Sequence, residues 1–360
     1  MGGNESTVGI VMGAGGIATL LSLPFIGSVI DRTGRRLFLM LGAASMATAS
    51  ACYLFIDEIG PALYALRLVQ GVSFAMAFTA TTTLAAELAP RDRRAQALGV
   101  FGVSALLTHA IAPGLGEELV SRAGFDALFA SATLCTVVSL CLSFGLPPDS
   151  QAHTARESVP WRLDRQQWLL GAIMVFCGLG FGAVVTFVPT YVKSEELGRV
   201  GVFYLSYTLT AILTRLVGAG ISDSLGRQRV IVPTLLVLSA AILLLSVVGS
   251  TLSLVLTGAL FGIAQGVNYP TLHAYLIDIT PESHLGRAQA LFNGAFNLGV
   301  TSSAFVFGAI AHQLGYRPMF LVAGLMPLGA LLTMVLMPLT STYAARATPV
   351  DLPAQRPPPP

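Results

Sequence analysis

Two arginines lie inside long apolar stretches of this sequence, where a charge is costly. Arg67 follows Leu63 by four residues and precedes Gln70 and Gly71, and Arg215 lies near the end of another apolar run. All eighteen Asp and Glu residues, by contrast, fall at the ends of such runs, in loops or in tails. Because a charge at membrane depth usually marks a pathway or an ion relay, Arg67 is expected to face a cavity. The alternative is an arginine that reaches the outer interface.

The other polar side chains within the apolar runs are uncharged or titrate near neutrality. His109 and His273 could carry a proton, because imidazole titrates near physiological pH, and the alternative is a buried histidine bonded to a carbonyl. Polar groups on three runs of the second half could line a cavity for a small polar or amphipathic ligand, or form hydrogen bonds between helices. These residues are Tyr204, Tyr207, Arg215, Gln265, Asn268, Tyr269, Asn293 and Asn297.

No catalytic or metal-binding pattern accompanies these residues. The sequence contains no HExxH, no GxSxG and no phosphate loop, and its four cysteines lie within apolar runs without a CxxC pair. Glycine-rich stretches at 13–18 and 178–183 fit a relaxed dinucleotide pattern, but they lie inside apolar runs rather than after a strand. The sequence therefore predicts neither an enzyme nor a bound metal or cofactor.

The elements that position these side chains are predicted to be membrane-spanning helices. Hydrophobic residues make up 54% of the chain and charged residues 11%, and the mean hydropathy is +0.74. A bilayer core requires about 20 apolar residues of helix, so the lipid bilayer is an expected partner. The net charge of +2 and the lack of a basic patch argue against nucleic acid. Eleven runs are long enough, at residues 8–30, 36–56, 61–86, 95–116, 124–146, 167–192, 200–221, 229–249, 252–277, 287–311 and 317–339.

One charged phrase occurs twice between apolar runs. Residues 27–36 read GSVIDRTGRR and residues 220–229 read GISDSLGRQR, so each copy has an Asp, a Gly three residues later and two Arg. The glycine allows a tight reversal of the backbone that a Cβ would hinder. Further matches follow in the same order at nearly the same offset, so the chain consists of two homologous halves. They are 94–98 with 287–291, both RAQAL, and Gln70-Gly71 with Gln265-Gly266.

The phrase resembles the charged loop between the second and third helices of major facilitator superfamily transporters, whose two six-helix halves each carry a copy. The resemblance covers nearly the whole chain and implies an all-α integral membrane fold with two pseudo-symmetric helical halves. Eleven of the expected twelve helices are present, and the repeat offset predicts that the first is missing through a truncated or misassigned start; a real eleven-helix chain is the alternative. The expected parts are a first half of five spans (1–146), a cytoplasmic linker (147–166), a six-helix second half (167–340) and a disordered proline-rich tail (341–360).

The resemblance also implies a gate at the two charged turns. In this family such contacts hold the cytoplasmic side closed and break when the halves rock, whereas the alternative is a signal for topology alone. Glu87 and Asp278 are matched acidic residues at the ends of corresponding runs and are expected partners for the arginines. The expected gating residues are Gly27, Asp31, Gly34, Arg35, Arg36, Glu87, Arg94, Asp223, Gly226, Arg227, Asp278 and Arg287.

Glycines and a proline are expected to shape helix packing. The stripe of Gly258, Gly262 and Gly266 suits close helix contact, as does Gly71. The run from residue 95 partly resembles a fifth-helix motif that the family associates with antiporters, which favours export; a kink with close packing but no antiport is the alternative. Gly99, Pro113 and Gly116 match the motif, whereas Thr108, Ala112 and Glu117 stand where glycines are expected.

Arginine placement predicts the orientation of the chain. Fourteen of the twenty Lys and Arg residues fall on the side of the two charged turns, which is therefore expected to be cytoplasmic together with the C-terminus. By resemblance, the chain is a monomeric secondary transporter of a bacterial inner membrane that works by alternating access. Proton-coupled efflux of a small organic molecule is the leading hypothesis. Uptake or facilitated diffusion is one alternative, and a membrane sensor or assembly partner without transport is another.

Overall fold

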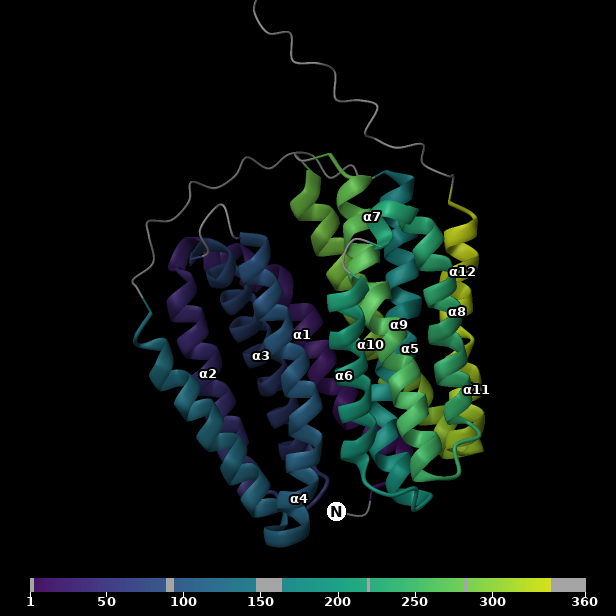
Figure 1. The fold of residues 1–360 in the computed structure, drawn as a ribbon. Helices are drawn as coiled ribbons and strands as arrows, with labels where there is room; N and C mark the ends of the chain where they lie inside the picture. Colours follow the sequence, from purple (N-terminus) through teal and green to yellow (C-terminus); the bar gives the residue numbers. More distant parts are fainter. Residues whose placement is uncertain (1–2, 89–93, 147–163, 219–220, 282–283, 338–360) are drawn as a thin grey trace, which may run out of the picture.

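The computed structural model describes residues 3–88, 94–146, 164–218, 221–281 and 284–337 (Figure 1). These residues form helices, with no strand among them, in agreement with the all-α prediction. The first half contains α1 (Glu5–Thr33), α2 (Arg35–Cys52), a short 3-10 helix (Tyr53–Phe55), α3 (Pro61–Leu88) and α4 (Arg94–Ser143). The second half contains α5 (Arg165–Ser194), α6 (Val200–Gly218), α7 (Ile221–Leu225), α8 (Arg227–Leu245), α9 (Thr251–Asp278), α10 (Leu285–Leu314), α11 (Tyr316–Gly324) and α12 (Met326–Val335).

Most of the expected linker, and the expected tail, lie outside the described residues. The last residues of the expected linker differ from the prediction, because α5 already begins at Arg165. Asp164 and Gln167 form a capping box there, in which the backbone N–H of Asp164 donates to Gln167 Oε1 at 2.9 Å. Such reciprocal bonds satisfy the free N–H groups of a helix start and extend the helix into the polar segment.

The described helices provide eleven candidate membrane crossings. Nine segments are long and apolar enough to span a bilayer, and residues 200–216 form a shorter apolar helix. The 50 residues of α4 would extend about 75 Å if straight, far more than a bilayer core of about 30 Å. They reverse direction at Gly124, where φ is 79° and ψ is −178°, so α4 crosses twice. Figure 1 shows its two limbs meeting at the bottom of the molecule.

Both charged turns lie at one end of the bundle. Gly34, between α1 and α2, has a φ of 103°, and Gly226, between α7 and α8, has a φ of 91°. L-residues rarely adopt these angles, which explains the glycine in each copy of the phrase. We call the end of the bundle with Gly34 and Gly226 the turn face, at the top of Figure 1. The end with Gly124 and the N-terminus is the opposite face.

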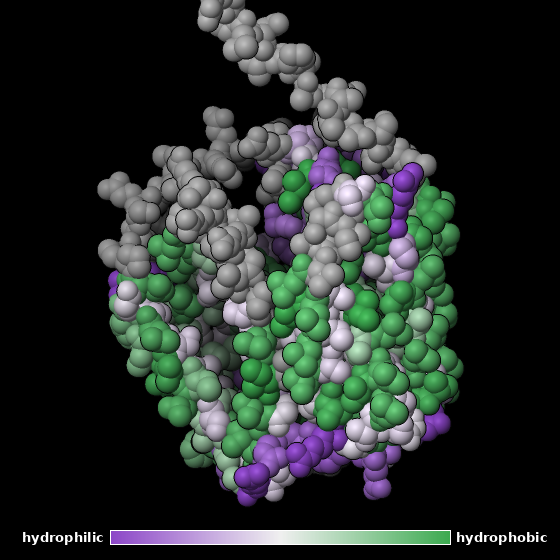
Figure 2. All heavy atoms as spheres, viewed as in Figure 1, coloured by the Kyte–Doolittle hydropathy of each residue, from purple (hydrophilic) through white to green (hydrophobic). Residues whose placement is uncertain are grey.

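The surface between these two ends suits a lipid environment. Large apolar side chains such as Leu252, Leu256 and Leu332 are more than 60% exposed on the outside of the bundle. Figure 2 shows a broad apolar belt with a polar rim at the opposite face. Apolar side chains that would destabilise a protein in water are favourable against lipid tails, so this belt is the part of the surface that contacts the bilayer core.

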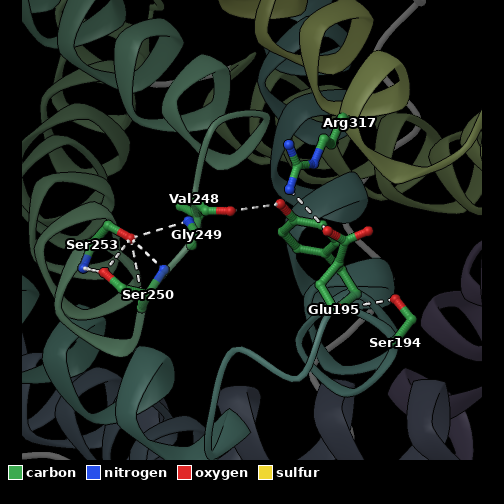
Figure 3. A network of polar contacts seen from close by, with 8 residues as sticks. Ser194, Glu195, Val248, Gly249, Ser250, Ser253 and Arg317 are labelled. Atoms are coloured by element: carbon green, nitrogen blue, oxygen red, sulfur yellow. Dashed lines mark hydrogen bonds and ion pairs between the residues drawn. The ribbon is translucent and has the colours of Figure 1, made fainter.

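Polar contacts fix the opposite end of the second half (Figure 3). Arg317 Nη2, at the start of α11, lies 2.9 Å from Glu195 Oε2 just after α5, and the Tyr191 hydroxyl donates to Val248 O at 3.3 Å. Ser250 and Ser253 form the capping box that starts α9. These bonds connect three helix ends at this end of the second half.

Candidate functional site

The two halves meet through two equivalent helix pairs. Helix α1 packs against α10, and α4 packs against α6. The sequence repeat relates α1 to α6 with α7 and relates the start of α4 to α10, so each pair is the counterpart of the other. The interface between the halves therefore follows the same pseudo-twofold relation as the sequence.

Small residues bring α1 and α10 into backbone contact. A Cβ built on Gly9 would meet the Ala304 carbonyl oxygen, and a Cβ on Gly16 would lie 2.5 Å from Thr301 Oγ1. The hydroxyl of Ser6 also reaches the Gly308 carbonyl at 3.4 Å. These residues belong to the end of α1 near the opposite face, so the contact closes that end of the molecule.

The equivalent contact of α4 with α6 includes a carboxylate. A Cβ on Gly201 would lie 2.8 Å from Gly114 Cα, and the Gly201 N–H donates to Glu117 Oε2 at 3.1 Å. Arg199 Nη1 lies 3.5 Å from Glu118 Oε2 beside this bond. A carboxylate at a helix N-terminus satisfies a free N–H group and interacts favourably with the helix dipole. Glu117 therefore joins the first half to the start of α6.

The sequence did not identify this contact, although it contained a signal for it. Glu117 stands where the fifth-helix motif calls for a glycine, and a carboxylate at such a position needs a partner. Its partner is 84 residues away in the other half. A second ion pair across the halves, between His312 Nδ1 and Glu5 Oε2 at 3.5 Å, also lies at the opposite face.

Toward the turn face, the surface between the halves is hollowed, as Figure 2 shows. The sides of α10 and α6 that pack against the first half near the opposite face also border this space. On α10, Asn293, Asn297 and Thr301 are spaced four residues apart, so the two asparagines share the side of the helix that packs on α1. On α6, Arg215 lies fourteen residues after Gly201, which places it close to the same side of the helix. These residues therefore line the second-half wall of the space between the halves.

Arg215 lies near polar groups of α6 and α9, one of which is bonded to α10. Its guanidinium is within electrostatic reach of Tyr207, on α6, and Tyr269, on α9. The Tyr269 hydroxyl donates to Asn293 Oδ1 on α10 at 3.2 Å, and Asn297 Nδ2 donates to the Asn293 carbonyl at 2.9 Å. Within the described residues, the buried Nε of Arg215 has no hydrogen-bond partner.

Arg67, on α3, has neutral partners. Its Nη1 donates to Gln70 Oε1 at 3.3 Å, and its Cζ lies 5.6 Å from the centre of the Tyr53 ring. The Tyr53 hydroxyl donates to the same Gln70 oxygen at 2.9 Å, so the three side chains form one cluster. Gly71 follows directly and lies against the backbone of Gly15 on α1. The cluster is thereby positioned by the packing of α3 on α1.

Several residues expected in the cavity are instead occupied by contacts between helices of the second half. The Tyr204 hydroxyl donates to Val185 O at 3.0 Å. Asn268 is 1% exposed and bonds to Thr234 and Cys177. His273 lies 2.7 Å from Gln289 Nε2, and Gln265 is buried. Burial and these partners place the four side chains within the packing of the half.

The glycine stripe of α9 lies along α6. Cβ atoms on Gly258, Gly262 and Gly266 would each meet a hydroxyl or backbone atom of α6, so only glycine permits this approach. Pro113 interrupts the hydrogen bonding of α4 from within, and a Cβ on Gly116 would lie 3.4 Å from Leu128 Cδ1, across the reversal at Gly124. Close contacts at glycines thus occur between α6 and α9 and between α6 and α4.

At the turn face, two arginines have contacts within their own halves. Arg227 Nε lies 2.9 Å from Asp278 Oδ2, and Arg36 Nη2 donates to the Phe144 carbonyl at 2.7 Å. Arg35 is buried, and Arg287 lies in the first turn of α10. The side chains or positions that fall outside the described part of the structure are Gly27, Asp31, Glu87, Arg94, Gly99, His109 and Asp223.

Comparison with known proteins agrees with this architecture. The profile of the Major Facilitator Superfamily matches residues 1–208 and 194–359. The staphylopine export protein of Staphylococcus aureus is 24% identical and aligns with 91% of this chain and 86% of its own length. A multi-drug resistance efflux pump homolog, PmrA, of Lactococcus lactis is 25% identical, with 88% and 81% covered.

Solved structures show the same fold. The nucleoside transporter NupG superposes with a TM-score of 0.76 at 13% identity, over 92% of this chain and 90% of its own. The human organic anion transporter MFSD10 gives a TM-score of 0.67 at 18% identity, over 91% and 83%. The chain consists of two helical halves that pack against each other, and the family profile matches nearly all of it. This protein therefore belongs to the major facilitator superfamily.

Proposed function

We propose that this protein exports a small organic molecule across the plasma membrane by alternating access, with protons moving in the opposite direction. The observation that carries the proposal is the pair of glycine-lined contacts, α1 with α10 and α4 with α6, that join the halves at the opposite face. Two halves joined in this way can rock about a central site. The printed names of the relatives, a staphylopine export protein and a multidrug efflux pump, favour export.

The turn face is assigned to the cytoplasm. Fourteen of the twenty Lys and Arg residues belong to loops and tails on this side, the distribution that cytoplasmic segments have. The hollow between the halves then opens toward the cytoplasm, where a compound to be exported would enter. The C-terminus follows α12 on the same side. The protein acts as a monomer in the lipid bilayer and needs no cofactor.

Closure of the cytoplasmic side would use the two charged turns. When the halves rock, the loops at Gly34 and Gly226 approach one another, and their Asp and Arg side chains can exchange partners across the gap. The bond from Arg227 to Asp278 stays within the second half in the described arrangement, so it is available for such an exchange. The gate would then open when the two halves separate at the turn face.

Proton coupling is assigned to the contact at the opposite face. Glu117 accepts a hydrogen bond from Gly201 N–H across the two halves. Protonation would remove the negative charge that the start of α6 stabilises and would weaken the contact as that face opens. His273 is bonded to Gln289 inside the second half, which leaves Glu117 as the better placed group among those described.

Transport into inside-out membrane vesicles tests the proposal. The vesicles come from a bacterium that lacks its own drug pumps, and a panel of fluorescent dyes serves as substrates. We expect one or more dyes to accumulate when respiration acidifies the vesicle interior, and an uncoupler to abolish that accumulation. Dye movement that is insensitive to the uncoupler would instead indicate facilitated diffusion. Vesicles without the protein provide the background.

A further inference from the structure

We infer that the polar cluster around Arg215 is a binding site for the carboxylate of an aromatic or amphipathic organic anion. This inference rests on the proposed export function and specifies the class of compound exported. The cluster consists of Arg215, Tyr207, Tyr269 and Asn293, and it combines one positive charge with hydroxyl and amide groups from three helices.

The first argument is the uncompensated charge. The helices that enclose the space between the halves, α1, α3, α4, α6, α9 and α10, contain Asp or Glu only near their ends or, in α4, near the reversal at Gly124. The buried Nε of Arg215 has no hydrogen-bond partner among the described residues. A guanidinium held at membrane depth without an anion is costly, and its planar donors match a carboxylate in two parallel bonds. A ligand carboxylate would supply the missing charge.

The second argument is the direction in which Arg215 points. Side chains of a helix lean toward its N-terminus, and the N-terminus of α6 lies at the opposite face. Arg215 therefore leans away from the turn face and into the membrane. Its electrostatic contact with Tyr207, two turns earlier on the same helix, agrees with this direction.

The third argument is depth. Tyr269 lies nine residues before the end of α9, and Asn293 lies eight residues after the start of α10. At about 1.5 Å per residue, both are about 12–14 Å from the helix ends at the turn face, near the middle of a bilayer core of about 30 Å. Arg215 lies in the last turn of α6 and leans toward this level, within electrostatic reach of Tyr269.

The apolar part of the ligand has a surface to contact. The Tyr269 ring packs edge-on against Phe292 and Phe296, with ring centres 5.6 and 5.5 Å apart. On the facing wall, the side of α1 that carries Gly13 and Gly16 continues with Leu20 and Leu23. A carboxylate attached to an aromatic or aliphatic body fits these surroundings, whereas a compact inorganic anion would leave the apolar wall unused.

Binding to the purified full-length protein in detergent tests the site without requiring transport. The probes are benzoate, benzamide and benzylammonium, which share a size and differ in charge. We expect benzoate to bind and to raise the melting temperature, and the other two to bind at least tenfold more weakly. Arg215→Gln should weaken benzoate binding at least tenfold, and Arg215→Lys, which keeps the charge, should weaken it less. Tyr269→Phe should weaken it severalfold.

The matched control is Arg165→Gln, which removes an exposed arginine at the start of α5 and should leave benzoate affinity unchanged. Equal binding of the three probes, or unchanged benzoate affinity in Arg215→Gln with its melting temperature preserved, would overturn the inference. If benzoate binds through Arg215 but no compound moves in vesicles, the site stands and the export proposal fails. If dyes are exported but benzoate ignores Arg215, the export proposal stands and the inference fails.

Discussion

The side-chain contacts of Arg67 orient its charge without neutralising it. Gln70 accepts one hydrogen bond, and Tyr53 offers the face of its ring. The position of α3 does not depend on Arg67, because Gly71 on α3 already packs against Gly15 on α1. A charge that packing does not require, at a position where it is costly, is expected to serve the transported species or the ion.

Replacing Arg67 with alanine should therefore abolish transport while leaving expression and membrane insertion intact. The measurement is dye accumulation in vesicles, normalised to the amount of folded protein found by size-exclusion chromatography. Arg165→Ala, at an exposed position, serves as the control for loss of one arginine. Wild-type flux in the Arg67 variant would show that the residue has no role in the pathway.

The Arg227–Asp278 pair allows a second test at this scale. Its side chains are 21% and 50% exposed, so water screens the interaction. Exposed pairs of this kind contribute about 0.2–1 kcal/mol, and Asp278→Asn should lower stability by no more than that. Arg227→Gln should lower it further, because it also removes the hydrogen bond from Arg227 Nη1 to Ser222 Oγ at 2.7 Å. In a double-mutant cycle of melting temperatures, the two effects should be less than additive. A coupling of several kcal/mol would mean that the pair is shielded from water.

At the scale of helices, glycines let α9 pack closely along α6. A Cβ on Gly262 would meet Thr210 Oγ1 and the Tyr207 carbonyl, and the backbone cannot move aside cheaply. Gly262→Ala should therefore destabilise the protein by about 1–3 kcal/mol, as overpacking of a core does. Thermal unfolding in detergent is the measurement.

Gly294→Ala is the matched control. Gly294 lies within α10, and a Cβ there would find nothing within 4 Å. Because alanine is the better helix former, this variant should be neutral or stabilised by up to about 1 kcal/mol. Equal destabilisation of the two variants would show that the loss comes from the backbone and not from the contact with α6.

The membrane-crossing runs could be predicted from the sequence, whereas the break between α11 and α12 and the rotation of each helix could not. Long apolar runs require membrane crossings, and the glycines at 34 and 226 require a reversal of the chain. Which side of a helix faces a neighbour depends on rotations that an almost uniformly apolar run does not encode. For Asn268 and Tyr204 the sequence leaves open a cavity wall or a hydrogen bond between helices, and their burial and bonds to Thr234 and Val185 agree with the second. The sequence marks Glu117 only as a departure from a motif, because its partner belongs to the other half.

For the whole molecule, the contact of α4 with α6 at Gly201 controls whether the opposite face can close. The halves are joined where Gly201 meets Gly114, so a larger side chain at Gly201 should prevent the opposite face from closing. A Cβ there would already lie 2.8 Å from Gly114 Cα, and leucine adds three more carbons. Gly201→Leu should thus shift the population toward the state that is open at the opposite face and closed at the turn face.

Labelling of a single cysteine measures this shift. The reporter is Asn297→Cys, on the wall of the space between the halves, in a chain whose four native cysteines are replaced by serine. With Gly201→Leu, a membrane-impermeant maleimide added at the opposite face should label the reporter severalfold faster, and label it more slowly from the turn face. Gly249→Leu, at a position on the same face with no neighbour within 4 Å, should leave both rates unchanged. If Gly201→Leu changes neither rate, the contact of α4 with α6 is not the barrier that closes the pathway, and the rocking of the halves must be limited elsewhere.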